Sequence, residues 1–225
     1  MWAGGECWII GGGPSMPRQF NIPEDVIQKV MRRELEPNAY SPYLEPLHSR
    51  HIIGINNVYQ IGNWIDILFF GDCPWYLVHR LKISNFPGLK VTCCNRFENK
   101  RKDGGDGLKY LAKNKEKREG ITTDKTMLSF NCNSGSAGIN LAVHLGVKRI
   151  ILLGFDMKID SRNITHWHGS HGELNKKIKR DPYPRHMRGF PLIKQEADSL
   201  GVEIINASPE SAIKEFEKVN VGDLL

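Results

Sequence analysis

Residues 7–20 of this 225-residue chain are CWIIGGGPSMPRQF, an apolar run that ends in three glycines and a proline. Glycine weakens a strand and proline cannot donate a hydrogen bond to a sheet, so the strand must end here. The turn from Gly11 to Ser15 also lets backbone amides approach an anion more closely than a Cβ would allow. We therefore expect a phosphate-binding turn whose donors are the amides of Gly12, Gly13 and Ser15 and the Ser15 hydroxyl. The alternative is a tight bend without a ligand.

This turn matches neither common glycine-rich nucleotide motif. No Gly-Lys-Ser/Thr follows the glycines, so it is not a Walker A loop. Met16 occupies the last glycine position of the dinucleotide pattern G-x-G-x-x-G. The sequence therefore disfavours a P-loop kinase and a conventional NAD enzyme.

Short apolar runs recur along the whole chain, at residues 7–10, 51–55, 65–70, 89–93, 127–130, 149–153 and 202–205. Their hydrophobicity is nearly continuous, which is typical of parallel strands buried on both faces. Helical patterns lie at residues 24–34, 136–145 and 190–200, and Gly146 and Gly201 are suited to end the last two. We predict an α/β fold with an open, mostly parallel, Rossmann-like sheet flanked by helices, formed by one domain over residues 1–225.

Two polar segments interrupt this pattern, and we predict that both are lids or mobile loops. Residues 96–120 contain DGGDG, which breaks a helix, and residues 157–186 form the longest polar connection. Residues 96–120 and 176–188 are rich in Lys and Arg, and the net charge of the chain is +6. A positive rim that steers a nucleotide, a phosphate or nucleic acid is one interpretation, and a solvated surface is the other. No familiar DNA-binding motif is present.

The composition, 40% hydrophobic and 25% charged residues, is that of a soluble globular protein. No apolar stretch reaches the roughly 18 residues of a membrane span, and the start MWAGGECWII lacks the basic region of a secretory signal. We therefore expect a cytoplasmic protein, with a homo-oligomer as an open possibility. The chain has five cysteines, none of them in a paired CxxC element, and Cys7 and Cys132 lie in apolar runs. We expect reduced, structural cysteines.

Ligands of open parallel sheets bind beyond the carboxyl ends of the strands. Small or polar residues follow six of the apolar runs, namely Gly11–Ser15, Asn56 with Asn57, Asp72, Ser134–Ser136, Asp156 and Asn206. We predict that they converge on one edge of the sheet as a nucleotide site. If a divalent ion takes part, Mg²⁺ held by Asp72 and Asp156 is the natural choice. No cofactor is otherwise required.

The stretch NSGSAG, residues 133–138, places two serines around Gly135 at the start of a predicted helix. Exposed amides at such an end favour a phosphate or a carboxylate. Ser134 or Ser136 could instead cap the helix without any ligand. We predict that Ser134, Gly135 and Ser136 bind the nucleotide.

Histidines supply the candidate bases. The stretch THWHGSH, residues 165–171, carries three imidazoles that could bind a metal, contact phosphates or be exposed. His186 stands apart between Arg185 and Arg188, and its alternative is a surface histidine.

The order GGGPS at residues 11–15, IIGINN at 52–57 and NSGSAGINLAVHLGVKRIILLGFDM at 133–157 resembles the bacterial sialyltransferases that use CMP-sialic acid. The same skeleton resembles archaeal hydroxymethylpterin diphosphokinases and uncharacterised phage proteins. The likeness covers most of the chain except residues 17–50 and 96–120.

The sialyltransferase resemblance implies roles for several residues. Gly12, Gly13, Pro14 and Ser15 would hold the phosphates of the nucleotide, Asn56 would contact it, and Ser134 and Gly135 would match a further contact. The family's general base is a histidine before the last helix, a place that His186 occupies. The THWHGSH cluster departs from the family, so the base is open between His186, His168 and His171. Gly12 also replaces an asparagine of the family, which leaves the donor sugar open.

Three functions follow from these observations. The first is a glycosyltransferase that moves a sugar from a nucleotide donor to an acceptor hydroxyl of a glycan, a small molecule or modified DNA, with a histidine base. The second is a Mg²⁺-dependent pyrophosphokinase that uses ATP. The third is a non-catalytic nucleotide-binding module. We favour the first.

Overall fold

The computed structural model of the chain describes residues 2–98, 107–169 and 181–225. Within these residues lies an eight-stranded sheet of order β10-β9-β8-β1-β2-β3-β4-β5, in which every neighbouring pair is parallel. Its strands are β1 (Glu6–Ile10), β2 (Ile52–Ile55), β3 (Ile67–Phe70), β4 (Leu89–Thr92), β5 (Leu108–Tyr110), β8 (Arg149–Leu153), β9 (Glu203–Asn206) and β10 (Glu217–Lys218). The predicted α/β fold with an open parallel sheet is confirmed.

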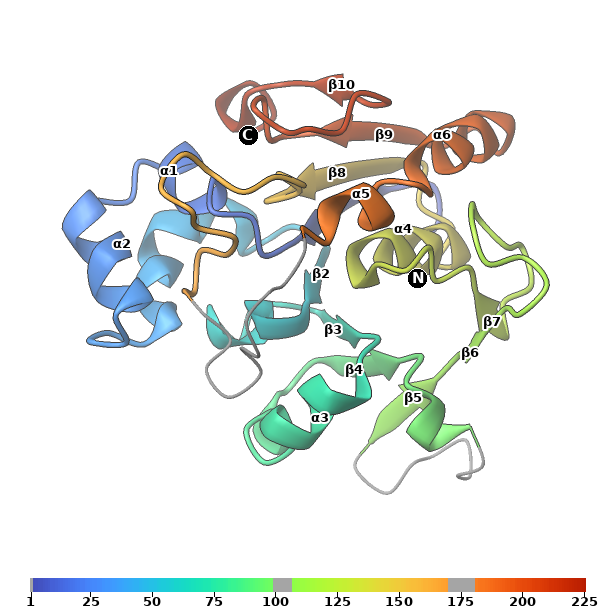
Figure 1. Cartoon of the computed structure of the whole chain (residues 1–225), viewed down its shortest axis with the longest axis horizontal. Helices are drawn as coiled ribbons and strands as arrows, with labels where there is room; N and C mark the ends of the chain where they lie inside the picture. Colours follow the sequence, from blue (N-terminus) through green and yellow to red (C-terminus); the bar gives the residue numbers. More distant parts are fainter. Residues whose placement is uncertain (1, 99–106, 170–180) are drawn as a thin grey trace.

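Helices cover both faces of the sheet (Figure 1). The α-helices are α1 (Met16–Gln19), α2 (Glu24–Met31), α3 (Cys73–His79), α4 (Ser134–His144), α5 (Tyr183–His186) and α6 (Phe190–Ser199). The 3₁₀ segments are η1 (Pro37–Leu47), η2 (Asn56–Gln60), η3 (Ile83–Asn85), η4 (Asn95–Phe97) and η6 (Val221–Asp223). Figure 1 shows the sheet running from β10 at the top to β5 at the bottom, with α2 on the left and α4 and α6 on the right.

Alternate residues of each strand point to opposite faces, so β1 contributes to two separate cores. Trp8 and Ile10 belong to the core that contains residues of α2, α3 and η1. Cys7 and Ile9 belong to the core that contains residues of α4 and α6. Burial on both faces explains why the strands are hydrophobic without alternation.

The order of the strands creates a crevice beside β1. From β1 the chain proceeds through β2, β3, β4 and β5 in one direction, whereas β8, β9 and β10 lie on its other side. The loop after β1 therefore leads toward β2, and the loop after β8 leads toward β9. These two loops diverge at the carboxyl ends of the adjacent strands β1 and β8. In open α/β sheets, this switch in direction is where ligands bind.

Two local expectations differ from the structure. The run at 127–130 is not a strand of the main sheet, because only β7 (Met127–Leu128) is extended and it pairs with β6 (Ala112–Lys113) in a separate two-stranded sheet. The described part of 96–120 is not wholly a lid, since β5 adds an edge strand to β4 with Leu108 buried. The short strands β5 and β10 carry too few residues for a sequence pattern to mark them.

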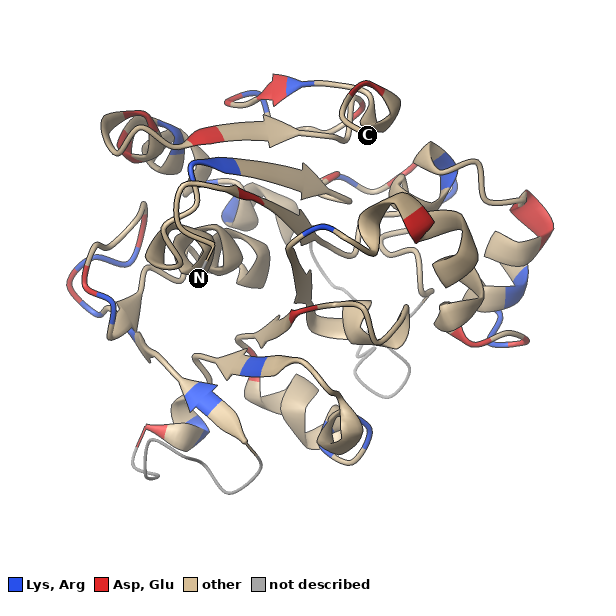
Figure 2. Cartoon of the chain, turned by 180° about the vertical axis from the view of Figure 1, so that it is seen from behind, with Lys and Arg blue, Asp and Glu red and all other residues tan. Residues whose placement is uncertain are grey.

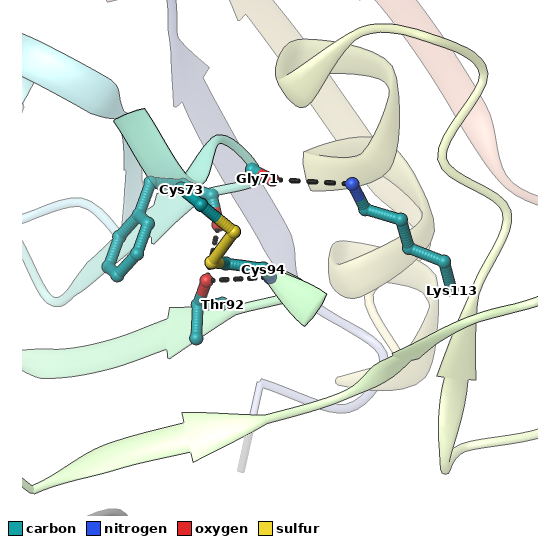
Figure 3. Close-up of a disulfide and its surroundings, with 6 residues drawn as sticks. Gly71, Cys73, Thr92, Cys94 and Lys113 are labelled. Atoms are coloured by element: carbon teal, nitrogen blue, oxygen red, sulfur yellow. Dashed lines mark hydrogen bonds between the residues drawn. A yellow bond between two sulfur atoms is a disulfide. The ribbon is translucent and has the colours of Figure 1, made fainter. Parts of the chain in front are cut away.

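A disulfide joins Cys73 and Cys94 (Figure 3), so the expectation of reduced cysteines is wrong for this pair. Cys73 opens α3 just after β3, and Cys94 follows β4, so two adjacent parallel strands bring their Cα atoms within 5.3 Å. Cys132 is exposed rather than buried. Cys7 and Cys93 are buried free thiols, and burial raises the pKa of both, which fits a structural role.

Charged residues lie mainly at the ends and edges of elements, and the central strands are almost uncharged (Figure 2). Each helix in the described ranges is too short or too polar to cross a lipid bilayer.

Candidate functional site

A cavity of about 440 Å³ opens at the carboxyl edge of the sheet. Its walls come from the loops after β1, β2, β3 and β8, from the start of α4 and from two stretches of the 157–186 segment. Eleven of the candidate residues line it: Gly11, Gly12, Gly13, Asn56, Asn57, Asp72, Ser134, Gly135, Asp156, His168 and His186. Residues that are far apart in sequence thus share one cavity, as expected for a switch point.

Five candidates do not line the cavity or cannot be placed. Pro14 and Ser15 do not line the cavity, and neither does Ser136, which is fully buried. His171 lies outside the described residues. Asn206, which follows the run at 202–205, is fully buried and its side chain accepts from the Ser208 amide, so it takes no part in the cavity.

The three glycines serve mainly for close packing, which corrects part of the expectation for this turn. The Gly11 amide donates to Leu153 O, and the Gly13 amide to Gly154 O, each at 2.8 Å. A Cβ on Gly13 would lie 2.6 Å from Asp156 Cγ and from Gly154 O. The amide of Gly13 is therefore occupied within the protein. No protein acceptor for the Gly12 amide is found in the described part of the chain, and Gly12 faces the cavity.

Ser15 is held by Asp156 instead of by a ligand. Its amide donates to Asp156 Oδ2 at 2.9 Å and its hydroxyl to Asp156 Oδ1 at 2.5 Å. Burial raises the pKa of Asp156, and the two hydrogen bonds from Ser15 oppose that rise. Through these two hydrogen bonds Asp156 positions the glycine turn. Each carboxylate oxygen keeps a further lone pair, so the expected role of Asp156 as a magnesium ligand stays a prediction.

Asn56 presents an unsatisfied acceptor. Its φ of 53° is in the left-handed region, which Asn tolerates better than most residues, and this ends β2 and starts η2. Its Oδ1 atom is buried and has no hydrogen-bond partner within the described residues. A buried polar atom without a partner is costly, and because the residue lines the cavity we treat Asn56 as a candidate ligand contact.

The start of α4 carries the second unsatisfied group. Asn133, and neither of the two serines, caps this helix, because its Oδ1 accepts from the Gly135 amide at 2.8 Å. The Ser134 hydroxyl is buried without a partner inside the described ranges and lines the cavity. Since the first amides of a helix have no acceptor within the helix, this end attracts an anion. The sequence interpretation that a serine caps the helix is wrong.

His186 lies on the wall formed by α5. Burial is the main cause of a lowered pKa for this imidazole, and the Arg185 cation lowers it further. The Asp72 and Asp181 carboxylates act in the opposite direction. A lowered pKa keeps the ring neutral near pH 7, which is the form that accepts a proton. Asp72 and Arg185 also line the cavity.

His168 belongs to a buried polar cluster. Its Nδ1 lies 3.4 Å from Asn57 Nδ2, and Asn57 Oδ1 accepts from Trp75 Nε1 at 2.6 Å. All three residues are buried. Both the oxygen and the nitrogen of the Asn57 amide thus face protein partners, whereas Asn56 Oδ1 has no partner among the described residues.

Several wall residues escaped sequence reasoning, and Trp167 is the clearest. Its amide donates to Gly12 O and its indole to Gly11 O, each at 3.0 Å, so residues 165–168 are anchored on the glycine turn. His166 packs against Gly12, where a Cβ would meet its ring at 2.7 Å. The Tyr183 hydroxyl donates to Thr165 O at 3.3 Å, and burial raises its pKa to about 12. The only indication in the sequence that Trp167 belongs to the site was its position within the stretch THWHGSH.

The predicted basic rim is only partly at the cavity. None of the described residues of 96–120 lines it, although Lys113 donates to Gly71 O at 3.3 Å (Figure 3), and Gly71 immediately precedes Asp72 in the sequence. Among the Lys and Arg residues that the structure describes, Arg185, from the second basic stretch, lines the cavity. In the described ranges no three or more His, Cys, Asp or Glu residues are grouped so that they could hold a metal ion.

The fold and its cavity define a class: an open parallel α/β domain with a site at its switch point. No protein-family model and no curated protein matches the sequence. Among solved structures, the chain is similar to the sialyltransferase CstII from Campylobacter jejuni. With cytidine-5'-monophosphate bound to that protein, the TM-score is 0.53 at 12% identity, over 95% of this chain and 84% of that chain. With CMP-3FNeuAc bound, it is 0.55 at 13% identity, over 95% and 85%. This likeness establishes a sialyltransferase-like fold, and the resemblance to pterin diphosphokinases and phage proteins stays a prediction.

Proposed function

We propose that this chain is a glycosyltransferase that moves a sugar from a cytidine-nucleotide donor to an acceptor hydroxyl, with His186 as general base. The observation that carries the proposal is one shared cavity: an imidazole of lowered pKa lines the same space as the unsatisfied groups of Asn56 and Ser134. In this proposal the His186 imidazole accepts a proton, and the Asn56 and Ser134 side chains bind the donor. CstII, whose fold is similar, was solved with CMP and with CMP-3FNeuAc.

The phosphate of the donor has a natural place at the start of α4. The Ser134 hydroxyl and the Gly12 amide are hydrogen-bond donors near the positive end of the α4 dipole, and Arg185 adds a positive charge to the cavity. The nucleoside would then satisfy the Asn56 Oδ1 acceptor. We infer that Gly11, Gly13 and Gly135 contribute close packing, since Gly11 and Gly135 both lie against the Phe155 ring.

The chemistry requires one proton acceptor and a stabilised leaving group. The acceptor O–H proton passes to the neutral imidazole of His186 while the acceptor oxygen bonds to the anomeric carbon of the sugar. The bond between that carbon and the phosphate oxygen breaks, and its electron pair stays on the nucleotide. Donors at the start of α4 stabilise the negative charge as it grows.

The pyrophosphokinase is less well supported. That reaction needs carboxylates for Mg²⁺, and Asp72 and Asp156 both line the cavity, but both oxygens of Asp156 already accept hydrogen bonds from Ser15, which favours a positioning role for this residue. A non-catalytic nucleotide module would bind the same ligands without turnover.

Titration calorimetry with CMP, UDP, GDP and ATP tests the nucleotide. We expect CMP to bind and the others to bind at least tenfold more weakly. Incubation with a CMP-sugar and hydroxyl acceptors, with and without EDTA, then tests transfer. Release of CMP that persists in EDTA and is lost in His186→Ala supports the proposal. Selective ATP binding with chelator-sensitive turnover would identify the pyrophosphokinase, and CMP binding without turnover would identify a binding module.

A further inference from the structure

Helix α3 is apolar on two opposite faces, and the described residues cover only one of them. Trp75, Tyr76 and His79 are buried and form the inner face. Leu77 and Val78 lie on the outer face and are 45% and 48% exposed. A helix that is hydrophobic all round is normally buried all round. The outer face of α3 therefore has the composition of a contact surface.

The outer apolar face continues past the end of the helix. Arg80 keeps helical backbone angles, with φ −51° and ψ −41°, so Leu81 stays in line with Leu77, four residues earlier. Leu81 is 79% exposed, more than any other large hydrophobic residue that the structure describes. Single exposed hydrophobic residues are ordinary, but a contiguous group marks an interaction site. We call Leu77, Val78 and Leu81 the α3 patch.

The segment that carries the α3 patch is basic. Residues 73–97 contain no Asp or Glu, and their Lys and Arg residues are Arg80, Lys82, Lys90 and Arg96. Arg80 and Lys82 are exposed and flank Leu81 in the sequence. Neither enters an ion pair within the described part of the chain. The α3 patch thus combines exposed aliphatic side chains with positive charge, on the outside of the molecule beside β4 (Figure 1).

We propose that the α3 patch docks onto a membrane surface that contains anionic lipids. Leu77, Val78 and Leu81 would enter the boundary between headgroups and acyl chains, where they lose their contact with water. Arg80 and Lys82 would meet the negative headgroups. A few aliphatic side chains hold a protein on a bilayer only weakly, so both contributions are needed. This inference does not depend on the proposed function.

The same charges argue against a second copy of the chain as the partner. In a two-fold dimer the α3 patch would meet itself, which brings Arg80 and Lys82 of the two chains close together. The small cavity next to the α3 patch, lined by Arg80, Ile83 and Lys90 among others, has a volume of about 10 Å³ and is too small for a side chain of a bound peptide. A bilayer needs neither opposite charges on a protein partner nor a groove.

Co-sedimentation with lipid vesicles tests the proposal. The natural chain should sediment with vesicles made of equal parts phosphatidylserine and phosphatidylcholine, and much less with phosphatidylcholine alone. Added salt should weaken binding to the mixed vesicles, because it screens the attraction between the cations and the headgroups.

Two double variants separate the two contributions. Leu77→Ser with Leu81→Ser should weaken binding to the mixed vesicles by about tenfold or more, since most of the apolar contact is lost. Arg80→Gln with Lys82→Gln should weaken it by roughly 10- to 30-fold, because each cation near an anionic surface contributes about fivefold. The charge variant should bind phosphatidylcholine vesicles as the natural chain does.

Two matched controls lie elsewhere on the surface. Leu35 is 38% exposed but stands between Glu34 and Glu36, so Leu35→Ser should leave vesicle binding unchanged. Lys214 is an exposed cation between β9 and β10, at the other end of the sheet, so Lys214→Gln should also leave it unchanged. All the changed side chains are exposed, and melting curves would verify that each variant is folded.

Three results would overturn the proposal. The first is a natural chain that binds neither vesicle, or binds both equally. The second is a Leu77→Ser, Leu81→Ser variant that binds the mixed vesicles as tightly as the natural chain. The third is a dimer of the natural chain, seen by analytical ultracentrifugation, that this variant abolishes, since it would assign the α3 patch to a second copy.

Discussion

Ser15 and Asp156 are 141 residues apart in sequence and are joined by two hydrogen bonds, at 2.9 and 2.5 Å. This contact ties the turn after β1 to the loop after β8, on the two adjacent strands that flank the cavity. It gives the glycine turn its shape from within the protein. A ligand is not needed to order it.

Removal of the Ser15 hydroxyl should therefore cost stability. Ser15→Ala leaves the buried Asp156 carboxylate with one donor fewer, and we expect a loss of about 1–3 kcal/mol in the free energy of unfolding. Urea unfolding measures it. In an Asp156→Ala background the same change should cost much less, and equal costs in both backgrounds would show that the two residues do not interact.

Ser134 and Ser136 offer a matched pair at the start of α4. Both hydroxyls are buried without a partner in the described part of the chain, but only Ser134 lines the cavity. Ser134→Ala should weaken CMP binding by about tenfold, the equivalent of roughly one hydrogen bond, and leave the melting temperature unchanged. Ser136→Ala should change neither quantity. Equal effects of the two variants on CMP affinity would contradict a ligand at Ser134.

The pKa of His186 should respond in opposite directions to its two charged neighbours. Its ordinary value is 6.5, and Arg185 lowers it whereas Asp72 raises it. Arg185→Gln removes a cation that opposes the imidazolium, so the pKa should rise. Asp72→Asn removes the attraction, so the pKa should fall. NMR titration of the ligand-free protein measures both shifts.

If His186 is the base, the pH dependence of turnover should shift in the same directions as the pKa of His186. The acid limb of the pH–rate profile should lie below 6.5 in the natural chain, move to higher pH in Arg185→Gln and to lower pH in Asp72→Asn. A limb that stays in place while the NMR value shifts would assign the base to another residue.

Gly12 and Gly13 should differ in how a methyl group is tolerated. Gly12→Ala meets the His166 ring, a side chain that can move, so we expect a loss of about 1–3 kcal/mol that His166→Ala relieves. Gly13→Ala meets the Gly154 carbonyl and Asp156, which are fixed by the sheet, so the same second change should not help. Thermal melting of the four variants checks this. Relief of both by His166→Ala would contradict the packing described.

The Cys73–Cys94 disulfide should stabilise the edge of the sheet near the cavity. It closes a loop of 21 residues, and its removal should cost about 2–4 kcal/mol by the chain-entropy model. Cys73→Ser with Cys94→Ser should melt at the same temperature with and without reductant, whereas the natural chain should melt lower in reductant. Cys132→Ser is the control and should behave like the natural chain. Five alkylated cysteines in the unreduced, unfolded protein would disprove the bond.

The amino-acid sequence by itself determined the fold class and the edge of the sheet where polar residues gather. Continuous apolar runs that end in glycine or polar residues are local consequences of strands buried on both faces, so they can be recognised without coordinates. Gly11–Gly13, Asn56, Asp72 and Ser134 were found in this way, because each directly follows a run or begins a helix.

Only the tertiary structure decided what each of these residues does. Whether an amide is open to a ligand depends on acceptors far away in sequence: Gly154 occupies the Gly13 amide, and Asp156 occupies that of Ser15. The partner of Cys73 and the orientation of Asn57 depend on neighbours brought by other strands and helices. Such contacts arise from packing between segments, and nothing in the local pattern of either segment encodes them.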